Sequence, residues 1–124
     1  MYKRQIKEFG LESIEDSMGY VLSGGQRRKV EIARCLASKP KIILLDEPFA
    51  GIDPLAIEDI KNVLKGLSDK GICILITDHN LRETIDICNY SIVIKDGSIL
   101  DKGEKDYLIN SSLIKEEYFG TVFD

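Results

Sequence analysis

A run of small polar residues at positions 22–26, with the sequence LSGGQ, has the composition of an anion-binding turn. It leads into a segment with apolar residues at helical spacing, so it would lie at a helix N-terminus. There, unpaired backbone N–H groups and the helix dipole favour a phosphate. Gly24 and Gly25 let the backbone approach an anion closely, and Ser23 adds a hydroxyl donor. A simpler interpretation is that Ser23 only caps the helix.

Two adjacent carboxylates, Asp46 and Glu47, directly follow an apolar run at residues 42–45. The run is short and contains two β-branched residues, which predicts a strand of a parallel sheet buried on both faces. Sheets of this kind bind their ligands at the carboxyl ends of the strands. An acidic pair at such a position is by itself more often only the start of a loop, so its meaning depends on the rest of the sequence.

A second apolar run, residues 72–76, ends close to the single histidine, His79. Between the two runs, Asp53 as N-cap and Pro54 in the first turn predict a helix start, and Gly71 predicts the helix end. Strand, helix and strand of these lengths form a βαβ unit with parallel strands and a right-handed crossover. His79 would then follow the carboxyl end of a strand, although a lone histidine is more often a packed or surface residue.

The remaining elements are predicted by the same kinds of signal. The two short strands near the C-terminus flank Asp96-Gly97, a dipeptide typical of a type I′ hairpin turn. Asn80 would cap a helix, with Glu83 three residues later as in a capping box. The order of elements predicts an α/β fold with a mostly parallel sheet flanked by helices. Further helices are expected at residues 4–9, 11–16, 25–38 and within 104–119, and the hairpin strands at 92–94 and 98–100.

The composition is that of one globular domain: 124 residues, 44% hydrophobic and 31% charged. The net charge of −4 disfavours a nucleic-acid-binding surface, and the basic run at residues 27–29 is interpreted as a solvated helix face. Cys35, Cys73 and Cys88 lie far apart in apolar surroundings, which predicts reduced core thiols in a cytosolic protein. The sequence has no signal peptide and no apolar run long enough for a membrane span, so membrane association is expected through a partner.

Taken in chain order, four of these features resemble the ATP-binding-cassette (ABC) ATPases. LSGGQ at residues 22–26 is the signature motif of that family, and residues 42–47 resemble its Walker B strand. Residues 50–53 stand where the family has its D-loop, and His79 stands where it has its switch histidine. The combination is far more specific than any single motif, and the resemblance covers nearly the whole chain.

The resemblance implies a role for each motif in an ATP-hydrolysing enzyme. Asp46 would hold Mg²⁺, generally through water, and Glu47 would polarise the attacking water. Two adjacent carboxylates suit that division, because successive residues leave a strand in opposite directions. His79 would contact the γ-phosphate of ATP, and Gly51 and Asp53 of the D-loop would communicate across an ATPase dimer. The signature residues that would bind ATP held by the second subunit are Ser23, Gly24, Gly25 and Gln26.

The resemblance also implies the architecture, the C-terminal part of a P-loop NTPase (RecA-like) domain. Residues 1–38 would be the end of the helical subdomain with the signature motif and its helix. Residues 39–103 would be the RecA-like core, and residues 104–124 a C-terminal helical tail. The implied partners are a second copy of the ATPase subunit and integral membrane transporter subunits, with no nucleic acid. The implied location is the cytoplasmic face of the bacterial inner membrane.

One motif of the family does not occur in these 124 residues. The P-loop, GxxxxGK[ST], cradles the phosphates of the nucleotide, and no glycine here is followed by lysine. The adenine-stacking aromatic residue and the Q-loop of the family are expected in the same upstream region. Met1 is therefore expected to be an internal start within a longer protein, and the 124 residues are expected to be inactive alone.

Within the family, residues 46–54 and 76–84 resemble the cytoplasmic ATPases of bacterial lipopolysaccharide export, as do residues 16–19 and 118–120. Gln26, where that group commonly has Glu, and the C-terminal tail differ from it. An ATPase of a branched-chain amino-acid importer is the alternative, although that group more often has Glu-His at the switch position. Two further alternatives stay open: a non-transport cassette protein of DNA repair, chromosome organisation or translation, and a fragment without catalysis.

Overall fold

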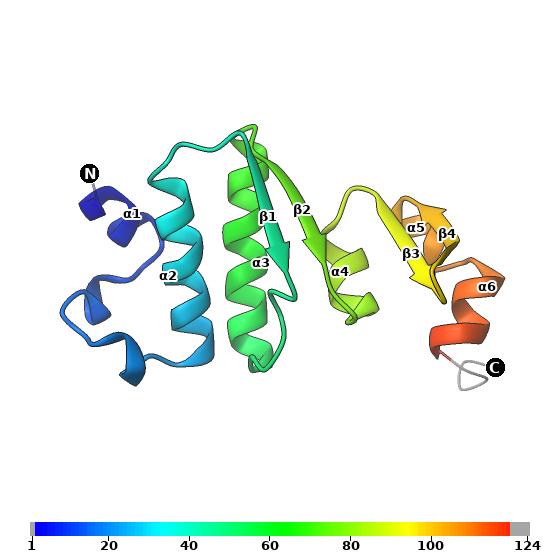
Figure 1. Ribbon diagram of the computed structural model, residues 1–124, viewed down its shortest axis with the longest axis horizontal. Coiled ribbons are helices and arrows are strands. Elements are labelled where there is room, and N and C mark those ends of the chain that lie inside the picture. Colours follow the sequence, from blue (N-terminus) through cyan, green and yellow to red (C-terminus); the bar gives the residue numbers. More distant parts are fainter. Residues whose placement is uncertain (1, 120–124) are drawn as a thin grey trace. The chain divides into compact units, whose positions relative to one another are not determined.

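The computed structural model describes residues 2–119, and its contacts divide the chain into two compact units, Met1–Asp78 and His79–Asp124. The first unit contains two parallel strands and the longest helices, and the second contains an antiparallel hairpin with short helices (Figure 1). Within the described residues, no helix is both long enough and apolar enough to cross a membrane.

The first unit alternates helices and strands in the predicted order. Its elements are α1 (Tyr2–Glu8), α2 (Gly24–Leu36), β1 (Ile42–Asp46), α3 (Pro54–Asp69) and β2 (Cys73–Thr77). The short acidic helix predicted at residues 11–16 is wrong: only a three-residue 3₁₀ turn, Glu12–Ile14, forms there, and a second such turn, Gly19–Val21, precedes α2. Gly10, at a φ of 63°, precedes this segment, and none of the residues Glu12–Ile14 is buried, so no packing supports a longer helix there.

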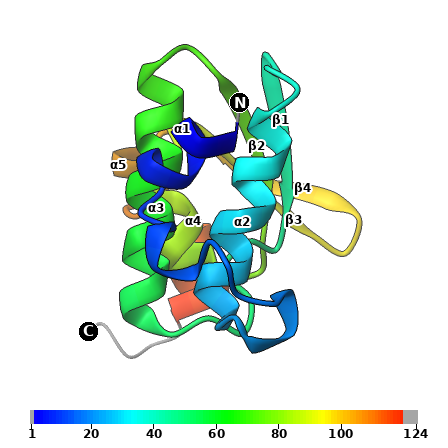
Figure 2. The same ribbon diagram turned by 90° about the vertical axis from the view of Figure 1, so that its left-hand side faces the viewer.

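Strands β1 and β2 pair in parallel, from Ile42 opposite Cys73 to Asp46 opposite Thr77. Helix α3 connects them, so the predicted βαβ unit is confirmed. Figure 1 shows α2 and α3 side by side, both beginning at the edge of the unit where β1 and β2 end. Figure 2 views the same unit from the side of α1 and α2. Two helix N-termini and two strand ends therefore share one edge of the first unit.

Helix α3 supplies much of the core of the first unit. The Asp53 carboxylate caps it by accepting a hydrogen bond from the Ala56 N–H (3.0 Å), and Pro54 occupies the first helical position. The helix ends just before Gly71, whose φ of 87° favours glycine. Its apolar residues recur at helical spacing and are almost fully buried: Ile57, Ile60, Leu64 and Leu67.

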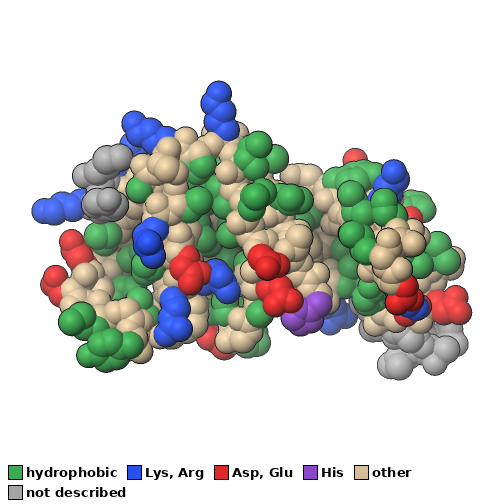
Figure 3. Space-filling view, in the orientation of Figure 1, with side chains coloured by type: hydrophobic (Ala, Val, Ile, Leu, Met, Phe, Trp, Pro, Cys, Tyr) green, Lys and Arg blue, Asp and Glu red, His purple; other side chains and the backbone are tan. Residues whose placement is uncertain are grey.

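Only one face of the β1–β2 sheet is covered within the described residues. Ile43 is 1% exposed, whereas Ile42, Leu44 and Leu75 are 60%, 72% and 58% exposed. Side chains alternate between the two faces of a strand, so one set is buried toward the helices and the other is open. The prediction that residues 42–45 are buried on both faces is therefore wrong, because a single helical layer packs on this sheet in the described part. Figure 3 shows apolar side chains at the surface over the strands.

Two of the three cysteines do not lie in the core, where the sequence predicts them. Cys35 and Cys73 are exposed, because one lies on the outer side of α2 and the other on the open face of β2; Cys88 is half-buried. All three are free thiols. Burial raises the pKa of the Cys88 thiol, and a hydrogen bond with Ser91 opposes that shift. Only Cys88 has the partly desolvated surroundings that the sequence predicts.

The second unit has a small apolar core of its own. Its elements are α4 (Leu81–Ile87), β3 (Ser91–Lys95), β4 (Ser98–Gly103), α5 (Lys105–Leu108), α6 (Ser112–Ile114) and a π-helical turn, Lys115–Phe119. The core consists of Ile85, Val93, Leu108 and Ile114, with Leu81 and Leu100 packed against it. The short helices predicted within residues 104–119 are confirmed, and the end of the predicted tail, residues 120–124, lies outside the described residues.

The hairpin of the second unit has the predicted turn. Asp96 and Gly97 both have positive φ, 50° and 76°, as a type I′ turn requires. β4 carries one extra residue, Leu100, at a β-bulge, which is irregular pairing that the sequence did not predict. Leu100 packs against the core of the unit, so the bulge adds an apolar side chain to that core.

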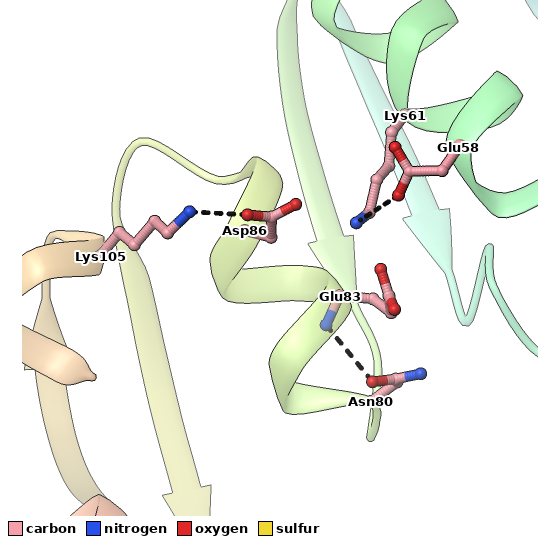
Figure 4. Close-up of polar contacts among 6 residues, drawn as sticks. All are labelled: Glu58, Lys61, Asn80, Glu83, Asp86 and Lys105. Atoms are coloured by element: carbon pink, nitrogen blue, oxygen red, sulfur yellow. Dashed lines mark hydrogen bonds and ion pairs between the residues drawn. The ribbon is translucent and has the colours of Figure 1, made fainter. Parts of the chain in front are cut away.

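Polar contacts join the short elements of the second unit (Figure 4). The Asn80 side-chain oxygen accepts a hydrogen bond from the Glu83 N–H (3.3 Å) and so caps α4 as predicted. Asp86 of α4 forms an ion pair with Lys105 of α5 (2.6 Å). The ion pair joins α4 to α5 at the surface, where pairs of this kind add little stability by themselves.

A second set of polar contacts centres on the carboxylate of Asp101 in β4. It accepts hydrogen bonds from the Ser111 hydroxyl, from the Lys102 N–H (2.9 Å) and from the Tyr107 hydroxyl. The Ser111 bond is the main reason that the pKa of Asp101 lies below its ordinary value, and the Tyr107 pKa is raised in turn. The ionised carboxylate is the favoured form, so this contribution to stability is present above the ordinary pKa of Asp and is lost as the pH falls through the lowered pKa.

Ile60 provides the first prediction. It is fully buried on the inner face of α3, so Ile60→Ala would leave a cavity and lower the free energy of unfolding by about 2–5 kcal/mol. Leu55→Ala, in the same helix but 82% exposed, is the matched control and should change that free energy by less than about 0.5 kcal/mol. Urea unfolding followed by circular dichroism measures both. Equal losses in the two variants would contradict the burial pattern of α3.

Candidate functional site

The glycine turn at residues 22–26 lies at the start of α2. The Ser23 hydroxyl oxygen accepts a hydrogen bond from the Gln26 N–H (3.2 Å), and the Gln26 side-chain oxygen accepts one from the Ser23 N–H (3.0 Å). Together they form a complete capping box, so the simple interpretation of Ser23 as an N-cap is confirmed. Because the cap uses the hydroxyl oxygen only as an acceptor, the hydroxyl keeps its hydrogen for donation to an anion.

The same turn offers backbone donors. Ser23 and Gly24 are exposed, whereas Gly25 is buried. The first N–H groups of an α-helix have no partner within the helix, and α2 with 13 residues is long enough to carry a substantial dipole. The predicted anion-binding turn thus exists as a helix N-terminus with an exposed serine and an exposed glycine. Gln26 shapes this turn through its side chain.

A cavity of about 300 Å³ borders the turn. The loop after α1 and the first turns of α2 and α3 line it, and the two N-caps, Ser23 and Asp53, both lie in its wall. Lys29 of α2 and Asp59 of α3 also line it and form an ion pair (3.1 Å) in which the lysine is mostly buried. Lys29 is therefore part of the α2–α3 contact, which the solvated-face interpretation of residues 27–29 missed.

The two carboxylates after β1 have different backbone settings. Asp46 is the last residue of β1, and its carboxylate accepts a hydrogen bond from the hydroxyl of Thr77, its pairing partner in β2 (2.7 Å). Glu47 lies beyond the strand, and its N–H donates to the Thr77 carbonyl oxygen (2.6 Å). Both acidic residues are exposed at the carboxyl edge of the sheet. Thr77 thus holds the end of β1 through its side chain and its backbone.

Glu47 adopts a φ of 48°, in the left-handed region that non-glycine residues rarely occupy. The sequence predicts that the two carboxylates point in different directions because successive residues of a strand alternate. That reason is wrong. The strand ends at Asp46, and the left-handed turn sets the direction of Glu47 instead. A strained non-glycine conformation at the end of a strand is typical of functional sites, because the surrounding structure must hold it in place.

Asp78 is a further polar residue at this edge. Its carboxylate accepts a hydrogen bond from the Phe49 N–H (3.3 Å), so the residue after β2 holds the loop that follows Glu47. Sequence reasoning assigned no role to Thr77 or Asp78. The signal for Thr77 was present in the predicted parallel pairing, which places the last residues of the two strands side by side.

The D-loop residues have defined backbone roles. Gly51 has a φ of 67°, and Asp53 caps α3, as described above. Both residues are exposed. The turn-and-cap interpretation of residues 50–53 is confirmed, and it leaves the exposed Gly51 backbone and the outer face of Asp53 open to a second role.

His79 is the first residue of the second unit. It is exposed, and its carbonyl oxygen accepts a hydrogen bond from the Leu81 N–H (3.1 Å) at the entry to α4. The first unit brings together the signature turn, both acidic residues after β1 and the D-loop. The part played by the His79 imidazole belongs to the functional proposal below.

The acidic edge has the donor chemistry that Mg²⁺ prefers. Mg²⁺ usually takes one or two carboxylates from the protein and completes its shell with water and phosphate oxygens. Asp46, exposed and oriented by Thr77, fits that limited role. Among the described residues no group of three or more His, Cys, Asp or Glu side chains forms a cage for a metal ion. The edge therefore suits a metal that arrives with a phosphate ligand better than a metal bound by protein alone.

The fold of this chain has close counterparts among solved structures. The ADP conformation of MJ1267, an ATP-binding cassette of an ABC transporter, superposes with a TM-score of 0.84 at 32% identity over 96% of this chain and 48% of that one. The cbiO1 protein from Clostridium perfringens, part of an ABC transporter complex, superposes with a TM-score of 0.81 at 30% identity. The family model described as ABC transporter matches residues 2–50. The chain belongs to the ABC ATPases and corresponds to the C-terminal part of their α/β P-loop NTPase domain.

Several curated proteins are similar to this chain in sequence. The lipopolysaccharide export system ATP-binding protein LptB of Haemophilus influenzae is 48% identical over 118 residues, which is 95% of this chain and 49% of that protein. LptB of Escherichia coli K12 is 47% identical over the same share of each chain. A probable ABC transporter ATP-binding protein of Azorhizobium caulinodans is 44% identical. The chain spans about half the length of the curated relatives it matches.

Ser23 provides the second prediction, which tests the contribution of the N-cap to stability. Ser23→Ala removes the capping oxygen and should lower the free energy of unfolding by about 1 kcal/mol. Ser23→Asp keeps a good cap and favourable charge at the N-terminus of α2, so stability should stay within about 0.5 kcal/mol of the original. Thermal and urea unfolding measure both. A free energy of unfolding for Ser23→Ala equal to that of the original would show that the observed capping box does not stabilise the chain.

Proposed function

We propose that these residues form the signature-bearing half of the nucleotide-binding domain in an ABC transporter ATPase that powers lipopolysaccharide export. The observation that carries the proposal is the shared edge of the first unit, where α2 and α3 begin and β1 ends (Figure 1). The residues that match the signature, Walker B and D-loop motifs lie in these three places. Water attacks the γ-phosphate of ATP at this edge, and ADP and phosphate leave. The P-loop half of the domain holds the nucleotide against it.

Glu47 is the general base of the proposed reaction. It orients the attacking water and accepts its proton as the γ-phosphoryl group transfers, which is a matter of positioning and charge stabilisation rather than covalent catalysis. The left-handed backbone at Glu47, held by the Thr77 carbonyl oxygen, supports a role that requires a fixed side-chain direction. His79 contacts the γ-phosphate, as in the family pattern that it matches.

Asp46 holds the metal ion of the proposed site, through water. When bound, Mg²⁺ supplies charge neutralisation of the phosphate oxygens. The hydrogen bond from Thr77 fixes one oxygen of the Asp46 carboxylate and leaves the other for this task. ATP and Mg²⁺ are thus the ligands that the proposal requires.

The signature turn acts on a nucleotide held by a second copy of the subunit. Ser23, Gly24 and Gly25 donate to its γ-phosphate at the N-terminus of α2, and Gln26 maintains the turn. ATP closes this dimer and hydrolysis opens it, with Gly51 and Asp53 of the D-loop at the contact between the subunits. The exposure of Ser23, Gly24, Gly51 and Asp53 supports a contact of this kind.

Lipopolysaccharide is proposed as the transported substrate on the strength of the 47–48% identity to LptB proteins over 95% of the chain. The subunit would bind integral membrane subunits on the cytoplasmic face of the bacterial inner membrane. These subunits contact the lipid, so the choice of substrate rests on the likeness of the ATPase. Co-purification of a full-length ATPase that contains these residues with its membrane subunits, followed by lipopolysaccharide release from proteoliposomes, tests this part of the proposal.

Glu47 provides the third prediction. In a full-length cassette with a P-loop half before these residues, Glu47→Gln should still bind ATP but hydrolyse it at least about 100-fold more slowly, because the water loses its base. The ATP-bound dimer should accumulate in size-exclusion chromatography. Glu12→Gln, an exposed acid in the loop after α1, is the control for loss of one surface charge. Turnover of Glu47→Gln within about threefold of the original would refute the assignment.

The fourth prediction concerns the 124 residues alone. Phosphates in sites of this class are held mainly by P-loop backbone N–H groups and the P-loop lysine, and Asp46 and Glu47 repel a triphosphate without them. The N-terminus of α2 offers a few hydrogen bonds in water, which leaves affinity for Mg-ATP no better than about millimolar. Isothermal titration on folded material is the measurement. Saturable low-micromolar binding would require a phosphate site beyond those described here.

A further inference from the structure

Helices α2 and α3 approach each other more closely at Gly25 than any side chain there would allow. A Cβ atom added to Gly25 would lie 2.6 Å from the Ala56 Cβ, and one added to Gly24 would lie 3.4 Å from the Gly51 carbonyl oxygen. Carbon atoms in van der Waals contact are about 3.5–4.0 Å apart. Gly25 is buried within α2 and has no positive φ, so the need for glycine is steric rather than conformational.

The contact continues along both helices. The Ile52 side chain would lie 3.8 Å and 3.9 Å from the Cβ atoms added to Gly24 and Gly25, so it covers both glycines. One turn further along α2, Lys29 pairs with Asp59 of α3 (3.1 Å). The start of α2 is therefore fixed against the start of α3 by a steric contact at one level and an ion pair at the next.

We propose that Ala56 is the reason for glycine at position 25, and that the Gly25–Ala56 contact positions the signature turn relative to the D-loop. Ala56 is a positioning residue: its N–H donates to the Asp53 cap, and its methyl group sets how closely α2 can approach. The signature turn and the D-loop then move as one body. The consequence for hydrolysis rests on the function proposed above, whereas the consequence for packing does not.

A methyl group at position 25 would move the two helix starts apart. Restoring an ordinary carbon–carbon contact from 2.6 Å requires a shift of about 1 Å. Catalytic groups displaced by about 1 Å can lose on the order of 100-fold in rate. Gly25→Ala should therefore reduce both stability and turnover through the position of α2, even though alanine adds no polar or charged group.

The test is a methyl swap in the full-length cassette. Gly25→Ala should lower the melting temperature by at least roughly 5 °C and lower kcat for ATP hydrolysis at least about tenfold. Ala56→Gly should lower the melting temperature modestly, because glycine is a poor helix former, and leave kcat within about threefold. In the double variant Gly25→Ala/Ala56→Gly, the nearest remaining atoms to the new Cβ are 3.8 Å and 3.9 Å away, so the methyl group fits.

The double variant distinguishes a direct contact between residues 25 and 56 from two independent effects on stability. If the contact acts as proposed, the double variant will be more stable than Gly25→Ala alone, and its kcat will be higher than that of Gly25→Ala. If the two substitutions act independently, it will be less stable than either single variant. Where Gly25→Ala does not fold at all, recovery of folded protein in the double variant is the same readout.

Gly66→Ala is the matched control. Gly66 lies within α3 and no atom is within 4 Å of its added Cβ, so alanine there should leave both the melting temperature and kcat unharmed. A melting temperature of Gly25→Ala equal to the original would overturn the proposal. Recovery of stability without recovery of kcat would also overturn it, because Gly25 would then be needed for nucleotide contact and not for position. A full-length cassette without ATPase activity would contradict the proposed function. The melting temperatures of the variants would still test the Gly25–Ala56 contact.

Discussion

The packing of α3 is the constraint on which the candidate site depends. One side of the helix buries its apolar residues in the core of the first unit, and its start contacts the start of α2. Even the charged Lys61 on this helix is only 8% exposed, with its ammonium paired to Glu58 at 3.1 Å (Figure 4). Because a parallel βαβ unit returns the chain to the same direction, the residues after β1 and β2 reach one edge together with the N-termini of both helices. The chemistry of the site follows from that arrangement.

The side chains at the ends of β1 and β2 supply mainly negative charge. Asp46, Glu47 and Asp78 place negative charges at the ends of two neighbouring strands, and each makes a contact with β2 or the adjoining loop. The donors of the signature turn lie in the same unit, but in the proposed dimer they serve the nucleotide of the other subunit. A triphosphate would therefore meet mainly carboxylates on its own side, and a metal ion is needed between them. This is the physical reason that affinity and catalysis are expected to come from different parts of a complete cassette.

Much of this arrangement was predictable from the sequence because its signals are local. Asp53-Pro54 and Gly71 set the limits of α3, Asp96-Gly97 set the hairpin turn, and residues 22–26 carry both a cap and a family motif. The burial of residues 42–45 on one face only was not predictable, because four apolar residues in a row do not reveal which face of the strand a helical layer covers. The close contact between Gly25 and Ala56 was not predicted either. A glycine required by a neighbouring helix looks the same in sequence as one required by an anion.

The left-handed backbone conformation of Glu47 is held in place by contacts with its neighbours. A glutamate at a φ of 48° costs on the order of 1–3 kcal/mol, so its neighbours must hold it there. They do so from both sides: the Glu47 N–H donates to the Thr77 carbonyl oxygen, its carbonyl oxygen accepts from the Ala50 N–H (3.2 Å), and the following Pro48 is fully buried. Asp78 holds the loop once more through the Phe49 N–H. Glycine and asparagine tolerate this region more readily than glutamate, so the conformation of Glu47 depends on these contacts. Tied to the neighbouring strand in this way, Glu47 has a fixed backbone position at the edge, which is what the proposed general base requires.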